Sequence, residues 1–224
     1  MSHANFSIPT TITFAAMLLE EIVTKFIIGL KQTGPIEFIA VISGIASVYF
    51  SKKENILVYP IGLVNTVFYV YISIQGHLPG EAAVNLYYTI MSIYGWIAWS
   101  RRDKRNIPVL QISSSTRKEK FGQFLFFAVI YITIFVSLNF LKKHFYPGAI
   151  PWADALASAS AFTGMWLMTR KKLESWTWWI ITNITSIPLY FVKDYVFTSV
   201  YYFILLILAF AGDAEWKKRM RHAV

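Results

Sequence analysis

Apolar residues along this chain fill a series of long runs that short polar segments separate. The seven clearest runs cover residues 36–51, 55–75, 81–100, 120–141, 152–169, 174–192 and 195–216. An α-helix of about 20 residues crosses about 30 Å of hydrocarbon, and most of the runs approach that length. The pattern therefore predicts an all-α polytopic membrane protein with seven spanning helices.

The segment before these runs, residues 10–31, has a different pattern. Its polar residues cluster on one helical face and include Glu20, Glu21 and Lys25, and the last two are spaced i,i+4. In the middle of a span, each of these charges would cost about 2.5–3.5 kcal/mol. We therefore favour an amphipathic helix at the membrane surface, with a spanning helix as the alternative.

The basic residues lie mainly in the connections between runs. Residues 52–53, 101–120, 170–172 and 217–221 hold 16 of the 21 Lys and Arg residues, and the alternate connections hold four. By the positive-inside rule, the C-terminus and the 101–119 loop lie in the cytoplasm. Topology thus explains the net charge of +9, and we expect no nucleic-acid partner.

Composition excludes several other classes. The chain is 56% hydrophobic and 15% charged, with a mean hydropathy of +0.48, whereas soluble domains carry about 25% charged residues. The absence of cysteine excludes disulfides and metal–thiolate sites. The sequence has no H-E-x-x-H motif and no phosphate-cradling glycine loop. We expect no catalytic residues, no metal and no cofactor, with an intramembrane enzyme as the remote alternative.

Two parts of the chain match when it is shifted by 117 residues. Glu37 then meets Asp154, Tyr59 meets Trp176, and Gly95 meets Gly212. This offset divides the chain into an N-terminal amphipathic helix (1–34), a first three-helix repeat (35–100), a basic loop with a linker helix (101–147), and a second three-helix repeat with a cytoplasmic tail (148–224). One linker helix gives both repeats the same orientation, so we predict a 3+1+3 parallel repeat with the substrate between the halves.

The run 174–192 carries a stripe of polar and aromatic residues. On a helix, one face of about 80° would hold Trp176, Trp179, Asn183, Ser186 and Tyr190. Such a face suits a flat ligand with polar edges. The alternative for the two tryptophans is an interfacial aromatic belt, which is the interpretation we prefer for Trp178.

Two further runs carry similar stripes. The run 55–75 aligns Gly62, Asn65, Tyr69 and Ile72, and the run 81–100 aligns Asn85, Tyr88, Ser92 and Trp96. The candidate substrate-binding residues are therefore Trp176, Trp179, Asn183, Asn65, Tyr69, Asn85, Tyr88, Trp96 and Tyr190. The alternative for Asn65 and Asn85 is hydrogen bonding between helices.

Charge in the runs limits both substrate and mechanism. No Lys or Arg occurs between Asn55 and Gln75 or between Ser175 and Val192, so a phosphorylated ligand would find no basic partner there. Acidic residues and histidines lie near the ends of the runs or outside them, so we expect no buried proton relay. We therefore predict a uniporter whose halves rock around the ligand.

Some of these residues resemble a known family. The block Asn85–Trp99, which reads NLYYTIMSIYGWIAW, resembles the signature of the PnuC family of nicotinamide riboside transporters, as do Asn55–Gly62 and the W-x-x-W of Trp176 and Trp179. The resemblance runs from about residue 35 to the end. One departure is Asn85, where many members carry Gln.

The resemblance implies a 3+1+3 fold similar to that of the sugar-transporting SWEET proteins. It also implies facilitated uptake of nicotinamide riboside (vitamin B3) across the bacterial inner membrane, drawn by phosphorylation in the cytoplasm. Related branches carry thiamine or riboflavin, which are the alternative substrates. The expected partners are this small molecule, the lipid bilayer and further copies of the chain in a homo-oligomer, for which we expect a trimer.

Overall fold

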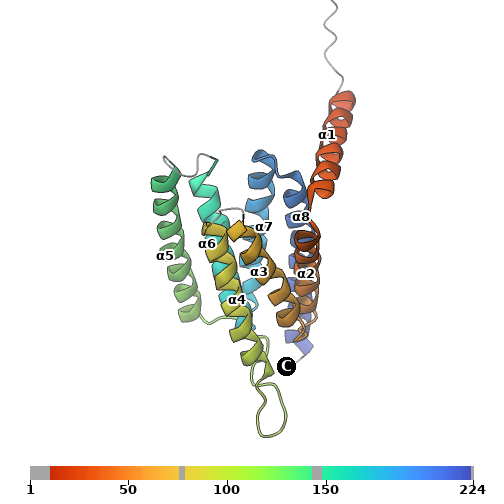
Figure 1. The fold of residues 1–224 in the computed structure, drawn as a ribbon. Helices are drawn as coiled ribbons and strands as arrows, with labels where there is room; N and C mark the ends of the chain where they lie inside the picture. The colour runs from red at the N-terminus through yellow and green to blue at the C-terminus, as the bar shows by residue number, and fades with distance from the viewer. Residues whose placement is uncertain (1–10, 76–78, 143–147, 223–224) are drawn as a thin grey trace, which may run out of the picture.

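The described residues, 11–75, 79–142 and 148–222 of a computed structural model, form eight α-helices (Figure 1). They are α1 (Thr11–Gln32), α2 (Pro35–Lys52), α3 (Val58–Gln75), α4 (Pro79–Ser100), α5 (Arg117–Lys142), α6 (Pro151–Thr169), α7 (Glu174–Val192) and α8 (Val196–His222). Proline occupies the first turn of α2 and α6, where its missing N–H costs no helical hydrogen bond.

The all-helical prediction is confirmed, and α2 to α8 coincide with the seven apolar runs. Within the described ranges, four helices are long and apolar enough to cross a membrane by length and composition: α2, α3, α5 and α8. Two of the others, α6 and α7, are less apolar for a structural reason. In α6 and α7 much of the length is buried Ala, Ser, Thr and Asn, which face neighbouring helices instead of lipid.

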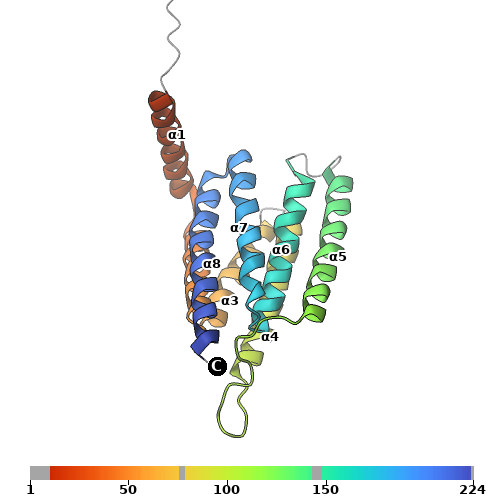
Figure 2. The same ribbon diagram turned by 180° about the vertical axis from the view of Figure 1, so that it is seen from behind.

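Six helices close a ring. Neighbours along the chain pack within α2–α3–α4 and within α6–α7–α8, and the ring closes through α4 on α6 and α8 on α2. The remaining two helices lie outside it, with α5 against α6 and α1 against the end of α8 (Figures 1 and 2). Each group of three therefore meets the other along two helix pairs.

The two groups of three repeat each other's contacts at an offset of 117 residues. The rings of Tyr59 and Trp99 meet edge to face at 5.2 Å, and those of Trp176 and Trp216 do so at 5.5 Å. The amide of Asn65 donates to the carbonyl of Ala40 at 2.7 Å, and the hydroxyl of Thr182 approaches the carbonyl of Ala157 at 3.5 Å. The tight turns after α2 and after α6 also have the same left-handed backbone conformation, with φ of 56° at Glu54 and 52° at Lys171.

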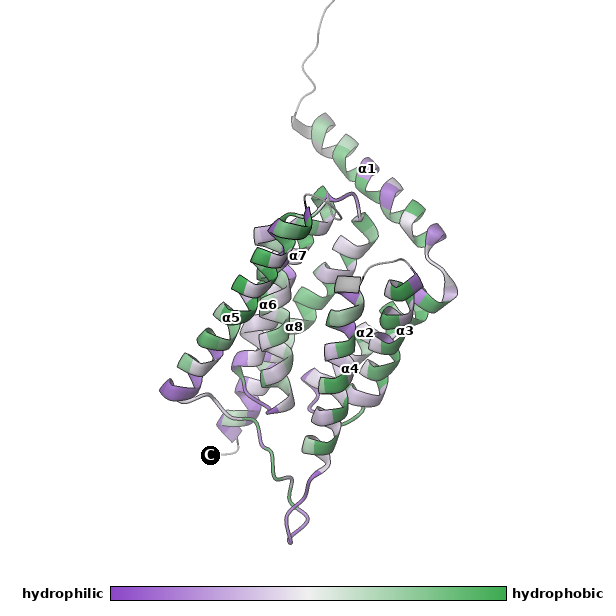
Figure 3. Ribbon diagram, turned by 60° about the vertical axis from the view of Figure 1, so that its left-hand side comes forward, coloured by the Kyte–Doolittle hydropathy of each residue, from purple (hydrophilic) through white to green (hydrophobic). Residues whose placement is uncertain are grey.

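Basic residues gather at one end of the bundle, which we call the basic end. It holds residues 53–57, 101–116 and 170–173, and α8 also ends there (Figure 1). Colouring by hydropathy shows the 101–116 loop extending beyond this end with a hydrophilic tip and a partly hydrophobic return, whereas α5 is largely hydrophobic along its length (Figure 3). Large apolar side chains on the outer face of α5 are exposed, as expected for a surface that faces lipid.

The N-terminal helix α1 is joined to the opposite end of the bundle. Its Lys25 bonds to Asp194 at 2.8 Å, in the connection between α7 and α8, and to Glu21 at 3.0 Å. The hydrogen bond to Asp194 raises the pKa of Lys25 above its ordinary value, and the hydrogen bond to Glu21 adds to this effect. The predicted pair of Glu21 and Lys25 is therefore present.

The prediction for Trp178 is wrong. An interfacial belt would leave its indole at the surface, but Trp178 is buried and packs on Phe124 and Phe127 of α5, with ring centroids 5.6 and 4.8 Å away. The reason is tertiary: α5 lies outside the ring and covers this part of α7.

Tight glycine contacts make a testable prediction about packing. Gly212→Ala should lower the free energy of unfolding by about 1–3 kcal/mol, because the added methyl group collides with the indole of Trp176. Gly122→Ala is the matched control, since nothing lies within 4 Å of its Cβ position. Thermal unfolding in detergent measures both variants, and equal melting temperatures would contradict this packing.

Candidate functional site

Polar side chains from both halves meet inside the ring, beginning at Gly44 of α2. Because Gly44 has no side chain, the hydroxyl of Tyr201 from α8 and the amide of Asn65 from α3 occupy the space where a Cβ would lie. The two groups hydrogen-bond to each other, and Asn65 also donates to Ala40. Asn65 therefore serves, at least in part, the structural role considered from the sequence.

Tyrosines continue this polar region toward the end of the bundle opposite the basic end. Tyr202 of α8 stacks on Tyr190 of α7, with ring centroids 5.2 Å apart and planes inclined by 11°. The hydroxyl of Tyr202 shares hydrogen bonds with Tyr190 and Ser186. Tyr69 of α3 lies near enough to interact electrostatically with Tyr201 and Tyr202.

Aromatic rings from α4, α6 and α7 meet on the other side of the ring. The rings of Tyr88 and Trp179 lie 6.2 Å apart, and Tyr88 also approaches Phe162 at 6.2 Å. Gly164 of α6 gives Trp179 its place, because a Cβ there would come within 3.3 Å of the indole. Tyr87 stacks on Phe162 at 4.2 Å and its hydroxyl donates to the Phe162 carbonyl.

Two polar atoms beside these groups lack a partner. Oδ1 of Asn183 and Oγ of Ser160 are buried without a hydrogen bond among the described residues. An unsatisfied buried polar group typically costs about 1–3 kcal/mol, so such atoms call for an explanation. Asn183 lies one turn beyond Trp179 on α7, so an unpaired acceptor stands next to an aromatic face.

We call the set of polar and aromatic residues inside the ring the central cluster. It comprises Asn65, Tyr69, Tyr88, Trp179, Asn183, Tyr190, Tyr201 and Tyr202. Six of these eight were candidates from the sequence. Tyr201 and Tyr202 were missed, although two phenols within an otherwise apolar run were an available signal.

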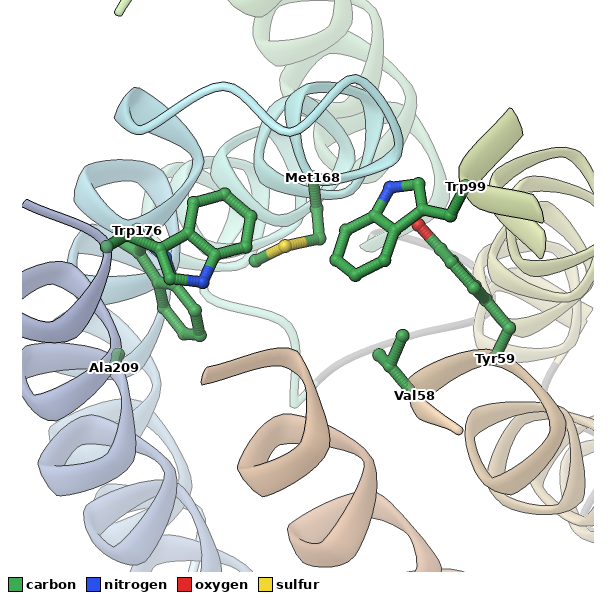
Figure 4. Packing of buried hydrophobic residues seen from close by; sticks show 7 residues of the cluster. Val58, Tyr59, Trp99, Met168, Trp176 and Ala209 are labelled. Atoms are coloured by element: carbon green, nitrogen blue, oxygen red, sulfur yellow. The ribbon is translucent and has the colours of Figure 1, made fainter. Parts of the chain in front are cut away.

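Three other candidates lie elsewhere or bond locally. Trp176 is 1% exposed and packs at the basic end with Tyr59, Trp99, Met168 and Trp216 (Figure 4). From Trp176 to Tyr190 the helix rises about 21 Å, so one small ligand does not reach both ends of the stripe. Trp179 contacts the edge of this group and links it to the central cluster.

The other two are Trp96 and Asn85 of α4. Trp96 is 41% exposed and lines a shallow outer pocket with Ile97, Ser100 and Arg101. The stripe drifts by about 80° between Tyr88 and Trp96, which turns Trp96 outward. Asn85 donates to the carbonyl of Glu81 in its own helix at 2.9 Å, so its amide bonds within α4 and not to another described helix.

Two asparagine variants separate a structural role from a binding role. Asn65→Ala should lower the melting temperature by several degrees, because it removes a bond to a backbone carbonyl in the interior, worth about 1–3 kcal/mol. Asn183→Ala should leave the melting temperature nearly unchanged, because no described residue hydrogen-bonds to its Oδ1. Thermal unfolding in detergent checks both, and a larger loss for Asn183→Ala would contradict this assignment.

Comparison with known proteins places the chain among membrane transporters. The Nicotinamide riboside transporter PnuC of Escherichia coli (strain K12) is 26% identical over 202 residues, which covers 81% of this chain and 84% of that protein. The Riboflavin/roseoflavin transporter RibM of Streptomyces davaonensis is 29% identical over 149 residues, covering 65% and 68%. The crystal structure of the Vitamin B3 transporter PnuC has the same fold, with a TM-score of 0.65, 22% identity and coverage of 97% and 95%.

A family model provides the broadest match. The model described as "Nicotinamide mononucleotide transporter" matches residues 34–218, which include α2 to α7 and most of α8. This range contains all of the central cluster and the whole ring except the last residues of α8. The chain therefore belongs to the nicotinamide mononucleotide transporter family.

Proposed function

We propose that this protein is a uniporter for nicotinamide riboside that works by alternating access around the central cluster. The observation that carries the proposal is the aromatic pair Tyr88 and Trp179 beside the unpartnered Oδ1 of Asn183, enclosed between two three-helix groups. The nicotinamide riboside transporters among its relatives support the choice of substrate.

The chemistry of the ligand matches these groups. The pyridinium ring is flat and cationic, and an aromatic face attracts a desolvated cation by about 2 kcal/mol. The carboxamide N–H donates to the unpartnered Oδ1 of Asn183, and the ribose hydroxyls bond to the phenols of Tyr190, Tyr201 and Tyr202.

The proposal selects the riboside over its 5′-phosphate, although the family description names the mononucleotide. No Lys or Arg occurs in α3 or α7, and Lys193, which directly follows α7, is paired with Asp154 at 2.6 Å. A phosphate would enter with about two negative charges and no free basic partner at these helices, so desolvation disfavours it.

A second vitamin remains the alternative substrate. The resemblance to the riboflavin/roseoflavin transporter makes riboflavin the specific competitor, and thiamine, also a flat cation, is the other alternative. The matching family and the matching solved structure are both described as transporters. We therefore propose a transporter without enzymatic activity, cofactor or metal.

We propose that α2 to α8 all span the bacterial inner membrane as a 3+1+3 parallel repeat. The repeats are residues 35–100 and 148–224, with 101–147 as loop and linker. The matching contacts at an offset of 117 residues and the closed six-helix ring support this arrangement. The 16 basic residues near one end support a cytoplasmic C-terminus. Residues 1–34 then form the interfacial segment.

We also propose a homo-oligomer, with a trimer as the state to test. The exposed Trp96 and Trp152 offer aromatic surface for subunit contacts. The mass of the purified protein in detergent tests the number of copies.

Intrinsic tryptophan fluorescence tests the substrate and the aromatic face together. Titration with nicotinamide riboside should give saturable quenching, whereas nicotinamide mononucleotide should give none at the same concentrations. Trp179→Ala should weaken binding of the riboside by about tenfold or more, because a cation–π contact of about 2 kcal/mol is lost.

Trp152→Ala is the control, because this indole is 59% exposed and lies at the start of α6. It should leave the affinity of each protomer for the riboside unchanged, because this indole is not part of the central cluster. Quenching by riboflavin or thiamine in place of the riboside would identify that vitamin as the substrate. Equal binding of the mononucleotide would contradict the argument that a phosphate finds no basic partner at α3 and α7.

The transport mode makes a separate prediction. Riboside uptake into proteoliposomes should follow its concentration gradient and stay within about twofold when the proton gradient is collapsed, because the middle of the spans carries no proton-relay group. Uptake that stops with the proton gradient would show coupled transport.

A further inference from the structure

We propose that Glu54, Lys171 and Arg219, together with the aromatic layer beside them, form a gate that closes the basic end of the bundle. The aromatic layer is Tyr59, Trp99, Met168, Trp176 and Trp216. This inference rests on the proposed function, since a gate requires a path to close. The gate must separate each time the substrate leaves toward the basic end.

The ionic part of the gate joins the two halves. Nζ of Lys171, which follows α6, lies 2.6 Å from Oε1 of Glu54, which follows α2. Arg219 of α8 approaches the other carboxylate oxygen at 3.4 Å. The side chain of Lys171 is only 5% exposed, and a charge buried to that extent depends strongly on its partner.

The backbone holds these two charges in unusual conformations. Glu54 has φ 56° and Lys171 has φ 52°, in the left-handed region that favours glycine at helix ends. In each turn the same hydrogen bond forms, from Glu54 N to Ser51 O at 2.9 Å and from Lys171 N to Met168 O at 3.0 Å. Two charged residues thus occupy positions where glycine is easier, and each supplies one half of the ion pair.

The aromatic layer also joins the halves. The hydroxyl of Ser51 donates to the sulfur of Met168 at 3.0 Å, and the indole N–H of Trp216 donates to the carbonyl of Ser51 at 3.1 Å. Nζ of Lys171 lies 4.6 Å from the ring centroid of Trp99, so the ion pair rests on this layer. Figure 4 shows Met168 between Trp99 and Trp176.

Several of these contacts join residues that are 117 positions apart. Ser51 and Met168, Glu54 and Lys171, and Trp99 and Trp216 are such pairs. Equivalent residues of two related halves touch each other only where they approach the axis that relates the halves. The gate therefore lies on that axis, in line with a path between the halves.

The aromatic layer has a feature that a permanent core would lack. Tyr59 Oη, Trp99 Nε1 and Trp176 Nε1 are buried without a hydrogen-bond partner among the described residues. Three unsatisfied donors weaken the closed layer, and each gains water or substrate as a partner when the layer parts. The contacts between the halves thus stabilise the closed arrangement, whereas the unpaired donors inside the aromatic layer destabilise it.

The ion pairs described at the opposite end do not join the two halves. They are Lys193 with Asp154, both in the second half, and Lys25 of α1 with Asp194. No ion pair between described residues of the two halves closes that end. Among the described residues, the ion pairs that join the two halves therefore lie at the basic end, and rocking of the halves must break the Glu54–Lys171 pair.

Cross-linking tests the gate, and the natural absence of cysteine makes it straightforward. Glu54→Cys with Lys171→Cys, joined by a short cross-linker that a reductant cleaves, should lower riboside uptake into proteoliposomes at least tenfold, with recovery on reduction. Asp213→Cys with Lys217→Cys is the matched control, because that 2.6 Å pair lies within α8 near the same end. Its cross-link should leave uptake unchanged.

A second measurement needs no substrate. A membrane-impermeant thiol reagent should label Ser51→Cys slowly, because this position is buried under the ion pair. Adding Lys171→Gln should raise the labelling rate at least fivefold, whereas Asp213→Asn should not. The double change Glu54→Gln with Lys171→Gln should raise the labelling rate in the same way, and it leaves no unpaired charge buried.

The outcomes separate the gate from the proposed function. Full uptake by the cross-linked Glu54–Lys171 variant, or unchanged labelling of Ser51→Cys after both neutralising changes, would overturn the gate. No riboside uptake by the control pair before and after cross-linking would instead overturn the proposed substrate, and the labelling experiment would still decide the gate.

Discussion

The structure depends on how closely helices approach within each half. At Gly95 and Gly212 there is no side chain, and the rings of Tyr59 and Trp176 fill the space that a Cβ would need. In a bilayer, helices gain little from hydrophobic burial against one another, so close packing at small residues provides much of their attraction. These two contacts hold α3 on α4 and α7 on α8, and each brings a large aromatic ring to the basic end.

A second constraint follows from the low polarity of the surroundings. Polar groups in the membrane must find partners within the protein. In the ring they do so largely in pairs, as for Asn65 with Ala40 and Tyr202 with Tyr190. Four of the five buried atoms left unpaired among the described residues lie where a ligand or water is expected: Oδ1 of Asn183 in the central cluster, and the indole and phenol donors of the aromatic layer. The fifth is Oγ of Ser160.

Much of the fold was predictable, because each helix carries its own signal. The apolar runs gave the bounds of α2 to α8 to within a few residues for most ends, since apolar length decides a span regardless of its neighbours. The exception is α8, which continues to His222 through charged residues that no longer need lipid. Part of the central cluster was predictable in the same way, from polar stripes on single helices.

The rest of the site needed the tertiary structure. A stripe shows which side chains share a face of one helix, but not how deep each lies or what the face meets. Trp176 and Trp179 share a stripe, yet Trp176 lies in the aromatic layer and Trp179 reaches Tyr88. Tyr201 joins the cluster because α8 packs against α2, and Tyr202 joins it because α8 packs against α7.

By itself the sequence determined the class of protein, its helices, the end where basic residues gather, and the 117-residue offset, because composition, length and periodicity are properties of the chain alone. Only the tertiary structure decided which residues meet across that offset. Glu54 and Lys171 have no local signal as partners, since their pairing arises from two turns that face each other across the ring.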